Sequence, residues 1–567
     1  MSGPAESMPA RRSRVRRATE AILARLLKLP GGATDYTITK DLRIPARDGA
    51  VLLADHLAPV GEARGTVLIR GPYGFDGTGA FVSGGLLARY GYHVVLARTR
   101  GTFGSGGTFE PFVREVDDAA DTVAWLRRQP FFGGRFATYG GSYLGFTQWA
   151  LLMDPPPELA TSVMQMVPHD FSRAAYADGA FNLDLTLGWS DHVTHQEDLS
   201  FLGAQLRGAT SVRRQRSANT TLPVAAAADR LTQGRATWFR EWATRRQLSD
   251  PYWGRTQLGA ALEKVDVPVL LQTGWQDLFL DQTLGQYARL RDRGVDVGLT
   301  VGPWTHQSSV MQGYATLIPE TLSWLAEHLD GDGGGRRPTP VRVQVTGTDE
   351  WRQLPAWPPA ATPVVLHPHP GGVLAADPAS AGSSPATFTY DPADPTPSLG
   401  GRLLPPKASG YKDDSDLASR TDVVTFTGPA LLAPLEVIGV PFVVLAHRSE
   451  NPHADLFVRV SEVGANGRSR NVTDGFVRLD TADSGEPVEL ELDAVAHRFA
   501  AGSRIRLSVA GGSFPRFERN LGTGEDPGTG TSMAASARAV DLAGSRLVLP
   551  VSVTDGHPPR PDAVRSS

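Results

Sequence analysis

The sequence contains no cysteine among its 567 residues. This absence excludes disulfides, thiolate zinc sites, iron–sulfur clusters and a cysteine nucleophile. It is compatible with a reducing compartment, and we expect a cytoplasmic protein. The chain also lacks an uncharged apolar run of about 18 residues, so no transmembrane helix is predicted.

A strong charge of either sign is missing as well. The 56 Lys and Arg residues against 60 Asp and Glu residues give a formal net charge of −4. A chain so close to balance has no global field for nucleic acid or anionic lipid, so neither is an expected partner. Hydrophobic residues make up 41% of the chain, which is enough for sizeable cores. The 61 glycines and 43 prolines imply many turns and hence a β-rich portion.

The N-terminus carries a basic stretch, Arg11–Arg17, followed by a helical apolar pattern over Thr19–Leu29. Glu20, Arg25 and Lys28 interrupt any apolar signal-peptide core, so no signal peptide is predicted. The pattern fits an amphipathic helix for a membrane or a partner, or a short helix docked on the body behind a basic arm. We favour the docked helix.

Short apolar runs bounded by Gly or Pro are typical of strands buried on both faces of a parallel sheet. Such runs are Thr66–Ile69, His93–Ala97, Phe136–Tyr139, Val267–Gln272 and Gly298–Val301. Between two of them, Val113–Arg128 has helical spacing, which gives a βαβ rhythm and the α/β fold class. Helical patterns then dominate from 151 to 260, as in Val224–Leu231 and Arg235–Gln247, and indicate an inserted helical region.

After the Gly-rich break Gly331–Gly335, short runs separated by Gly, Pro and Asp turns replace this alternation, beginning with Val341–Val345. That spacing predicts an all-β sandwich. The expected organisation is a basic arm and short helix at 1–34, an α/β domain in two parts at 35–150 and 261–335, a helical insertion at 151–260, and a β-sandwich at 336–567.

The strongest local signal for chemistry is a serine on a predicted strand-to-helix turn, Tyr139–Gly145 (YGGSYLG). A nucleophile on such a sharp turn needs small neighbours, and Ser142 follows two glycines. The helix behind it offers N-terminal N–H groups to an oxyanion. The spacing is Gly-x-Ser-x-x-Gly rather than the strict Gly-x-Ser-x-Gly, so the motif needs support from elsewhere in the chain.

Two further residues complete the chain order Ser, acid, His. Asp277 follows the predicted strand Val267–Gln272, and His306 follows Gly298–Val301 in the same way. Catalytic groups of open α/β sheets gather at the carboxyl ends of the strands. The sequence therefore predicts a triad in which Ser142 attacks, His306 transfers the proton and Asp277 orients the imidazole.

The oxyanion formed in such a reaction needs hydrogen-bond donors. One is the backbone N–H of Tyr143, the residue after the nucleophile. The other is expected from the loop Arg70–Gly74, where the Tyr73 hydroxyl is either a donor or part of the packing.

Several motifs in chain order carry a resemblance to a known family. They are Arg70–Tyr73 (RGPY), Arg100–Gly101 with Ser105 and Gly107, Gly140–Gly145 (GGSYLG), Gly274–Asp277 (GWQD), Gly302–His306 (GPWTH), Ala454–Val458 (ADLFV) and Phe514–Asn520 (FPRFERN). With them, most of the chain resembles the CocE/NonD hydrolases, the cocaine-esterase-like relatives of X-Pro dipeptidyl-peptidases. The resemblance implies an α/β-hydrolase domain with a helical cap and a C-terminal jelly-roll. It assigns Ser142, Asp277 and His306 as the triad, and Tyr73 with the Tyr143 amide as the oxyanion hole.

Two departures qualify the resemblance. The family often carries Asp where this chain has Arg98, and we expect a changed local salt bridge there. Only a short segment precedes the hydrolase pattern, which favours the esterase-sized branch over the longer X-Pro dipeptidyl-peptidases.

The substrate pocket is expected between the cap and the triad. Its candidate residues are Trp189, Phe181, Trp275 and Phe279, each of which could equally be a core residue. An aminopeptidase-type enzyme would also need buried carboxylates to bind a substrate ammonium. Candidates for that role are Asp178, Asp184, Asp191, Glu197 and Asp281.

The stretch Asp191–Glu197 (DHVTHQE) also suggests a metal site, because His192 and His195 share a helix face. No HExxH order is present, and a solvated helix is the favoured interpretation. No metal or other cofactor is therefore predicted.

The sequence predicts a serine hydrolase that cleaves an ester or amide bond through an acyl-enzyme, and most closely a CocE-like acyl esterase. The alternatives are an exopeptidase releasing X-Pro dipeptides and an acyl or thioester hydrolase of secondary metabolism. From a different class, an inactive hydrolase-fold protein could use the jelly-roll for binding. The expected partner is a small-molecule ester, amide or short peptide, with a homodimer allowed.

Overall fold

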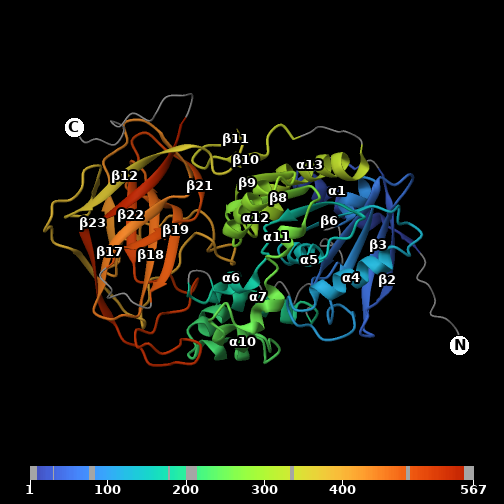
Figure 1. The fold of residues 1–567 in the computed structure, drawn as a ribbon, viewed down its shortest axis with the longest axis horizontal. Coiled ribbons are helices and arrows are strands. Elements are labelled where there is room, and N and C mark those ends of the chain that lie inside the picture. The colour runs from blue at the N-terminus through green and yellow to red at the C-terminus, as the bar shows by residue number, and fades with distance from the viewer. Residues whose placement is uncertain are drawn as a thin grey trace.

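Two large β-sheets, one in each half of the molecule, organise the fold, as Figure 1 shows. The computed structural model describes residues 9–29, 31–32, 34–75, 84–176, 179–198, 213–331, 337–479 and 486–553. The first sheet has 11 strands and the second has 12. A group of helices lies between the two sheets at the lower edge of the view in Figure 1, near the labels α6, α7 and α10.

The first sheet has the strand order β1-β2-β3-β5-β4-β6-β7-β8-β9-β10-β11. Its N-terminal strands pair antiparallel, and the strands from β5 and β4 through β10 are parallel to their neighbours. The bounds are β1 Ala10–Arg11, β2 Tyr36–Pro45, β3 Val51–Pro59, β4 Gly65–Gly71, β5 Tyr92–Arg98, β6 Phe136–Gly141, β7 Leu159–Gln165, β8 Val269–Gln276, β9 Val297–Thr305, β10 Val341–Gln344 and β11 Trp351–Leu354.

Helices cover both faces of this sheet, and a separate apolar core lies under each face. One core includes side chains of α1 (Arg14–Leu26) and its C-terminal cap, α3 (Leu86–Arg89) and α13 (Tyr314–Leu325). The other includes side chains of α4 (Glu115–Leu126), α5 (Tyr143–Leu151), α11 (Ala261–Lys264) and α12 (Leu280–Asp292). This two-sided burial explains the continuous apolar runs in the sequence. Short π-helical turns, η5 Ser309–Gly313 and η6 Ala326–Asp330, flank α13.

The N-terminal helix α1 is docked on the body by one face. Buried Glu20 accepts hydrogen bonds from the Arg16 guanidinium and from the hydroxyl of Tyr36 in β2. On the opposite face, Val15, Ile22 and Leu26 are exposed. Helix α1 is therefore attached to β2 through Glu20 on its inner face, and apolar side chains are exposed on its outer face.

The predicted strands of the α/β part are confirmed, with two differences in extent. Gly274–Gln276 and Gly302–Thr305 continue β8 and β9, so Asp277 and His306 come directly after strands. Strand β7 lies inside the stretch where we expected only helices, because its mixed sequence LATSVMQ lacks a clear apolar run.

The strand predicted over Val341–Val345 lies in the first sheet, although we expected it in the C-terminal β-sandwich. It forms β10, which pairs in parallel with β9 and so extends the first sheet rather than the second. Short apolar runs look alike in both sheets, and only their pairing partners distinguish them.

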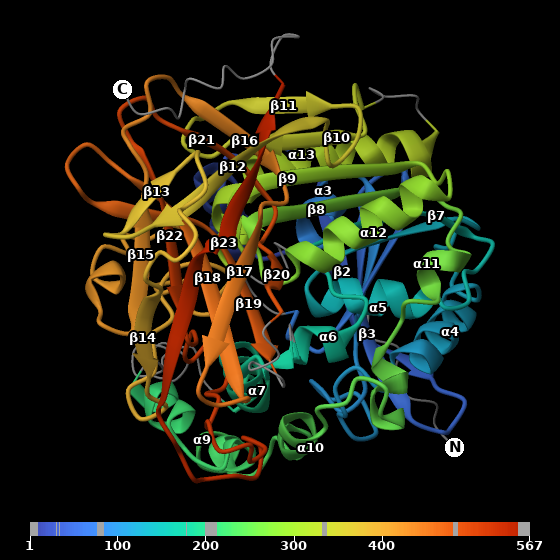
Figure 2. The ribbon, with the colours of Figure 1, turned by 60° about the vertical axis from the view of Figure 1, so that its left-hand side comes forward.

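Most of the described helical segments between β7 and β8 lie beside the carboxyl ends of the strands. They are α6 Phe171–Ala175, α7 Leu183–His195, η3 Val224–Ala226, α9 Ala227–Leu231, α10 Phe239–Thr244 and η4 Pro251–Thr256, whereas α11 packs against the sheet just before β8. Figures 1 and 2 show this group against the lower part of the second sheet. Backbone hydrogen bonds join the two parts, from Asp184 N to Pro515 O and from Val224 N to Pro527 O.

The second sheet belongs to a C-terminal part that is rich in β-strands and has its own apolar core. Its pairing is antiparallel except where β13 meets β15. The bounds are β12 Ala361–His369, β13 Val373–Ala375, β14 Ala386–Tyr390, β15 Val423–Thr427, β16 Leu435–Gly439, β17 Phe442–Ser449, β18 Ala454–Val463, β19 Ser469–Leu479, β20 Val488–Glu491, β21 Val495–Phe499, β22 Arg504–Ala510 and β23 Ser536–Ser552, with the short turn η7 Leu417–Ser419.

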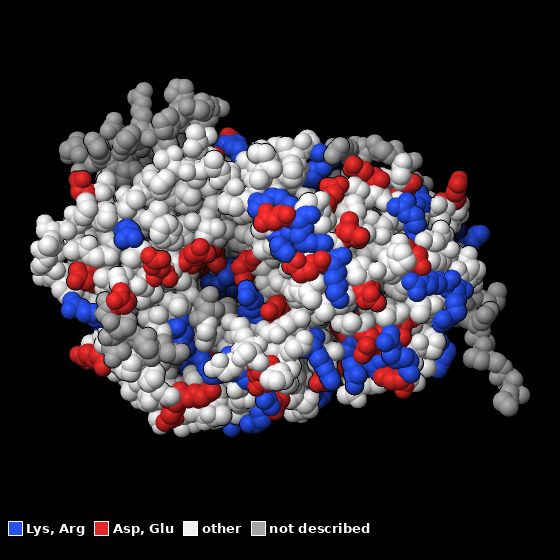
Figure 3. All heavy atoms as spheres, in the orientation of Figure 1, with Lys and Arg blue, Asp and Glu red and all other residues white. Residues whose placement is uncertain are grey.

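Ion pairs link neighbouring elements within and between the two halves. Arg98 donates to Asp41 and Asp55, both at 2.7 Å, at the antiparallel side of the first sheet. Arg402 of the C-terminal half reaches Asp281 of α12 at 2.9 Å. On the face drawn in Figure 3, basic and acidic side chains are interspersed. Among the described residues, no helix is long and apolar enough to cross a membrane.

Candidate active site

Ser142 occupies the tight turn between β6 and α5. Its φ of 57° and ψ of −125° lie outside the helical and extended regions, which is uncommon for a residue with a side chain. The Ser142 N–H donates to Gln165 O at 3.0 Å, so the strained turn is held by the neighbouring strand β7. Such strain places a side chain above the sheet edge, as a nucleophile requires.

The glycine that follows at a distance of three residues has a steric reason. A Cβ atom on Gly145 would lie 1.8 Å from Cγ1 of Val167. Helix α5 therefore approaches the segment after β7 more closely than any side chain at this position allows. This close approach accounts for the Gly-x-Ser-x-x-Gly spacing.

Asp277 and His306 meet because β8 and β9 are neighbours that end at the same level. Asp277 Oδ1 lies 2.6 Å from His306 Nδ1. The other carboxylate oxygen accepts hydrogen bonds from Thr273 Oγ1 at 3.1 Å and from Phe279 N at 3.0 Å. The carboxylate is fully buried and has partners on both oxygens, so it can hold one imidazole orientation.

The second ring nitrogen of the same histidine faces the serine. His306 Nε2 lies 3.0 Å from Ser142 Oγ. Phe279 packs against the imidazole edge to face, with ring centroids 5.3 Å apart. The Ser142–His306–Asp277 arrangement provides a hydroxyl, a base within hydrogen-bond distance and a group that orients the base.

Tyr73 lies next to this arrangement, in the segment after β4. Its hydroxyl accepts a hydrogen bond from Trp189 Nε1 at 3.1 Å and lies within hydrogen-bond reach of the Ser142 hydroxyl. Burial raises the pKa of Tyr73, against the opposing effect of these two hydrogen bonds. The hydroxyl therefore stays protonated at neutral pH and can donate.

A second donor stands beside it at the start of α5. Tyr143 is the first residue of that helix, so its amide has no acceptor within the helix. The Tyr143 and Tyr73 rings meet edge to face with centroids 6.5 Å apart. The Tyr73 hydroxyl and the Tyr143 amide thus come from two neighbouring elements on one side of Ser142.

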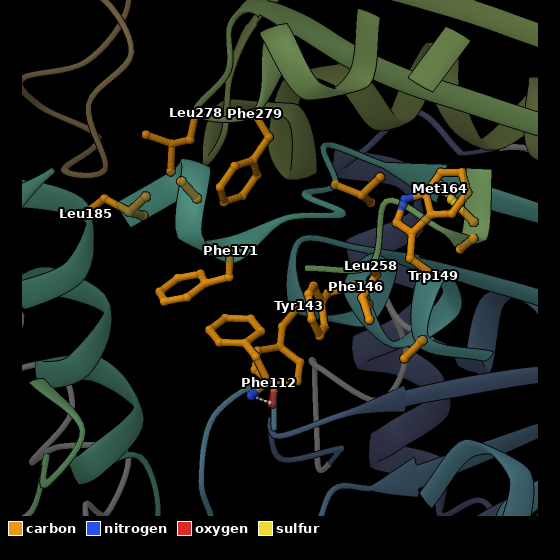
Figure 4. Packing of buried hydrophobic residues seen from close by; sticks show 14 of the residues in the cluster. Phe112, Tyr143, Phe146, Trp149, Met164, Phe171, Leu185, Leu258, Leu278 and Phe279 are labelled. Atoms are coloured by element: carbon orange, nitrogen blue, oxygen red, sulfur yellow. Dashed lines mark hydrogen bonds between the residues drawn. The ribbon is translucent and has the colours of Figure 1, made fainter. Parts of the chain in front are cut away.

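A cluster of buried aromatic side chains lies beside Tyr143. Phe112 stacks on Phe171, with ring centroids 4.1 Å apart, and on Tyr143; Figure 4 shows these residues with Phe279, Leu185 and Leu278 of the same cluster. The cluster continues through tilted or edge-to-face ring contacts with Phe109, Trp189, Trp238 and Trp242. The sequence analysis did not single out Phe112 or Phe171, because nothing local shows which aromatic rings of distant segments converge.

Of the predicted pocket residues, Trp189 and Phe279 lie at the triad, whereas Phe181 and Trp275 do not. Phe181 is fully buried against Tyr176 and Phe239 within the insertion. Trp275 is buried near β10, where its Nε1 donates to Gln344 O and its ring contacts Trp357. Neither residue is placed at the triad as predicted, because the sequence shows that a large apolar side chain is buried, whereas only packing decides which neighbours it meets.

Three of the five acidic candidates for an ammonium site have partners within the fold. Asp184 accepts a hydrogen bond from Leu404 N at 2.9 Å, and burial raises its pKa to about 6. Asp281 pairs with Arg402, and Asp191 faces His195 and Arg214. Glu197 is exposed, and Asp178 lies outside the described residues.

The metal alternative finds no ligand cluster in the part of the chain that the structure describes. Within it, no group of three or more His, Asp or Glu side chains could hold a metal ion. His195 instead has its Nδ1 2.9 Å from Asp191 O, a contact within α7.

Comparison with known proteins gives a consistent match across the chain. Residues 48–308 match the family described as X-Pro dipeptidyl-peptidase (S15 family), and residues 334–546 match the X-Pro dipeptidyl-peptidase C-terminal non-catalytic domain. A cocaine esterase of Rhodococcus sp. (strain MB1 Bresler) is 30% identical over 551 residues, covering 86% of this chain and 93% of that esterase.

Two solved structures share the fold. An alpha-amino acid ester hydrolase superposes with a TM-score of 0.78 at 22% identity, covering 92% of this chain and 98% of that one. A CocE/NonD family hydrolase from Staphylococcus aureus superposes with a TM-score of 0.66 at 17% identity, covering 91% of this chain and 94% of that one. The likeness extends over both halves of the molecule.

Proposed function

The chain belongs to the CocE/NonD family of serine hydrolases, and we propose that it is an acyl esterase whose nucleophile is Ser142. The observation that carries this proposal is the hydrogen-bonded series Ser142–His306–Asp277 beside the Tyr73 hydroxyl. An ester or peptide hydrolase agrees with the family. We propose in addition the catalytic roles of Ser142, His306 and Asp277 and a preference for esters over peptides.

In the proposed reaction, Ser142 Oγ attacks the ester carbonyl while its proton passes to His306 Nε2. The resulting oxyanion accepts hydrogen bonds from the Tyr73 hydroxyl and the Tyr143 N–H. His306 then returns the proton to the departing alcohol, which leaves Ser142 acylated. A water molecule gives a proton to His306 and attacks the acyl carbonyl; when the C–O bond to Ser142 breaks and the acid leaves, His306 returns that proton to Ser142 Oγ.

The substrate class follows from the side chains in front of the triad. Aromatic rings contact the site residues: Phe279 packs against His306, and Trp189 hydrogen-bonds to Tyr73. Leu278 and Phe279 stand directly after Asp277 in the sequence. A neutral, apolar acyl group gains by burial against such a surface, whereas a substrate ammonium would lose hydration without a carboxylate partner. We therefore propose an uncharged aliphatic or aromatic acyl group.

The architecture around the site has a proposed role as well. We propose that the helices between β7 and β8 form a cap and that the second sheet is a jelly-roll supporting it. The contact between Trp189 of α7 and Tyr73 supports the first part. The backbone bonds from Asp184 and Val224 to the C-terminal half support the second.

A second candidate function is favoured by the family match itself. The catalytic match is to an X-Pro dipeptidyl-peptidase family, so the release of X-Pro dipeptides stands as the alternative. It would require a group near the pocket that accepts a substrate ammonium.

One experiment distinguishes the acyl esterase from the X-Pro dipeptidyl-peptidase. Purified wild type and Ser142→Ala are assayed with p-nitrophenyl acetate, butyrate and benzoate, and with Gly-Pro-p-nitroanilide. Ester turnover that is lost in Ser142→Ala, with the anilide uncleaved, is the expected result. Rapid anilide cleavage would replace the esterase by the dipeptidyl-peptidase, and ester turnover that survives in Ser142→Ala would refute the nucleophile.

A further inference from the structure

A buried ion pair between Arg70 and Glu115 lies beside Tyr143, whose amide is one of the two proposed oxyanion donors. Arg70 and Glu115 expose 4% of their surface each. Arg70 Nη2 donates to Glu115 Oε2 at 2.9 Å, and Nη1 donates to the Glu115 carbonyl at 3.2 Å. Removing one partner of such a pair leaves the other charge buried without its counter-charge, which destabilises the folded protein.

The second carboxylate oxygen of Glu115 reaches the residue after the nucleophile. The Tyr143 hydroxyl donates to Glu115 Oε1 at 2.9 Å and accepts the Phe112 N–H at 2.8 Å, the bond drawn dashed in Figure 4. Burial raises the pKa of Tyr143 well above its ordinary value, so the hydroxyl is a donor at neutral pH. The Tyr143 ring also stacks on Phe112, with centroids 4.4 Å apart.

The same ion pair is connected to the other oxyanion donor through the backbone. Arg70 lies in β4, three residues before Tyr73. Its carbonyl accepts a hydrogen bond from Thr147 Oγ1 of α5 at 3.0 Å. The next residue, Gly71, is so close to α5 that a Cβ there would lie 2.6 Å from a Leu144 methyl carbon. The end of β4 and the start of α5 are thus joined at several points.

We propose that Glu115 is a positioning residue of the oxyanion hole: held by Arg70, it fixes the Tyr143 side chain and with it the Tyr143 amide relative to Tyr73. The inference rests on the proposed function, because it assigns a role to the surroundings of that same site. The side-chain hydrogen-bond partners of Glu115 are Arg70 and Tyr143 rather than Ser142, His306 or Asp277, so it acts on the site through these two residues.

The physical reason is the steep dependence of oxyanion stabilisation on geometry. A donor contributes when it lies about 2.7–3.1 Å from the oxyanion, and a misplacement of about 1 Å can cost roughly 10² in rate. The start of α5 is held at its backbone by β4 and β7, through Thr147 Oγ1 to Arg70 O and through Ser142 N to Gln165 O. The Glu115 contact adds a hydrogen bond at the other end of the Tyr143 side chain, at its hydroxyl.

The test uses two variants that remove the contact in different ways. Glu115→Gln keeps the shape but loses the charge that pairs with Arg70, and Tyr143→Phe keeps the ring but loses the hydroxyl. Each is expected to lower kcat by about 10- to 100-fold with KM changed less than about threefold. The double variant is expected to be little worse than the more affected single one, because both act through one contact.

A second readout separates positioning from simple loss of stability. Phenylboronic acid forms a tetrahedral adduct with an active-site serine, so one of its boron-bound oxygens occupies the oxyanion hole. Its inhibition constant is expected to rise in both variants in proportion to the fall in kcat/KM. Asp455→Asn is the control, since Asp455 is equally buried and pairs with Arg478 in the second sheet. That variant is expected to lower Tm while keeping kcat and boronate affinity.

Ser142→Ala is measured in parallel so that the two proposals can fail separately. If Ser142→Ala is inactive while both Glu115→Gln and Tyr143→Phe keep wild-type kcat and boronate affinity, the positioning role is refuted and the nucleophile stands. If Ser142→Ala remains active, the proposed function itself is refuted. If Glu115→Gln does not fold, Tyr143→Phe alone decides: unchanged boronate affinity refutes the inference, and a proportional loss supports it.

Discussion

The indole N–H of Trp189 donates to the Tyr73 hydroxyl oxygen at 3.1 Å, which links the helical insertion to the segment after β4. Because the Tyr73 oxygen accepts this bond, the Tyr73 proton is left for another acceptor. In this structure the Ser142 hydroxyl lies within its reach, and in the proposed reaction the acceptor is the oxyanion of a Ser142-bound substrate. Under that proposal, Trp189, 116 positions away in the sequence, orients the donor.

Tyr73→Phe is expected to lower kcat by roughly 10²–10³, since it removes one oxyanion donor. Trp189→Phe is expected to cost about tenfold, and little more when added to Tyr73→Phe, because it acts through the same hydroxyl. Steady-state kinetics on a p-nitrophenyl ester measure both. Trp324→Phe, which loses an indole bond to Thr161 in the core under the other face of the sheet, is the matched control. Additive losses would contradict the link between Trp189 and Tyr73.

Asp277→Asn is expected to lower kcat by roughly 10⁴ with the fold intact, because the amide stabilises the wrong imidazole tautomer. The measurement is kcat for ester hydrolysis, with Tm as the check on folding. Asp281→Asn serves as control, since that carboxylate is four residues further along the chain and largely exposed. A loss below tenfold in Asp277→Asn would mean that another group orients His306.

Acid should destabilise the protein through His56. Burial, together with the neighbouring His93, lowers the pKa of His56 from 6.5 to about 3. Between these two values the unfolded state binds a proton that the folded state rejects, so the free energy of unfolding falls as pH decreases. His56→Gln is expected to flatten the fall of Tm between about pH 6.5 and 4. Parallel Tm curves for variant and wild type would show that other groups account for the acid sensitivity.

Gly145→Ala is expected to destabilise the protein by at least about 1–3 kcal/mol, the usual cost of overpacking, because its Cβ would overlap Val167. Adding Val167→Ala is expected to recover part of the loss. Chemical denaturation measures the free energy of unfolding. Gly285→Ala on α12, where a Cβ meets no atom within 4 Å, is the control and should be neutral or stabilising. Equal effects of the two alanines would contradict the steric account.

Local pattern was enough to find the residues that meet at the site. Ser142, Asp277 and His306 were predicted from their places after short apolar strands, and all three are brought together at 2.6–3.0 Å. This works because parallel strands that neighbour one another end at the same edge, so residues at their ends converge. The strand β7 was missed because its burial comes from neighbours on both sides rather than from an apolar run.

The sequence by itself thus determined the fold class, the order of the strands that carry chemistry and the three residues of the proposed triad. The tertiary structure alone decided which side chains face that triad. Trp275 turned out to pack against Trp357, and Phe112, Phe171 and Glu115 came to the site from segments with no chemical motif. The reason is physical: periodicity tells which residues are buried, whereas the identity of the neighbours depends on how distant elements pack.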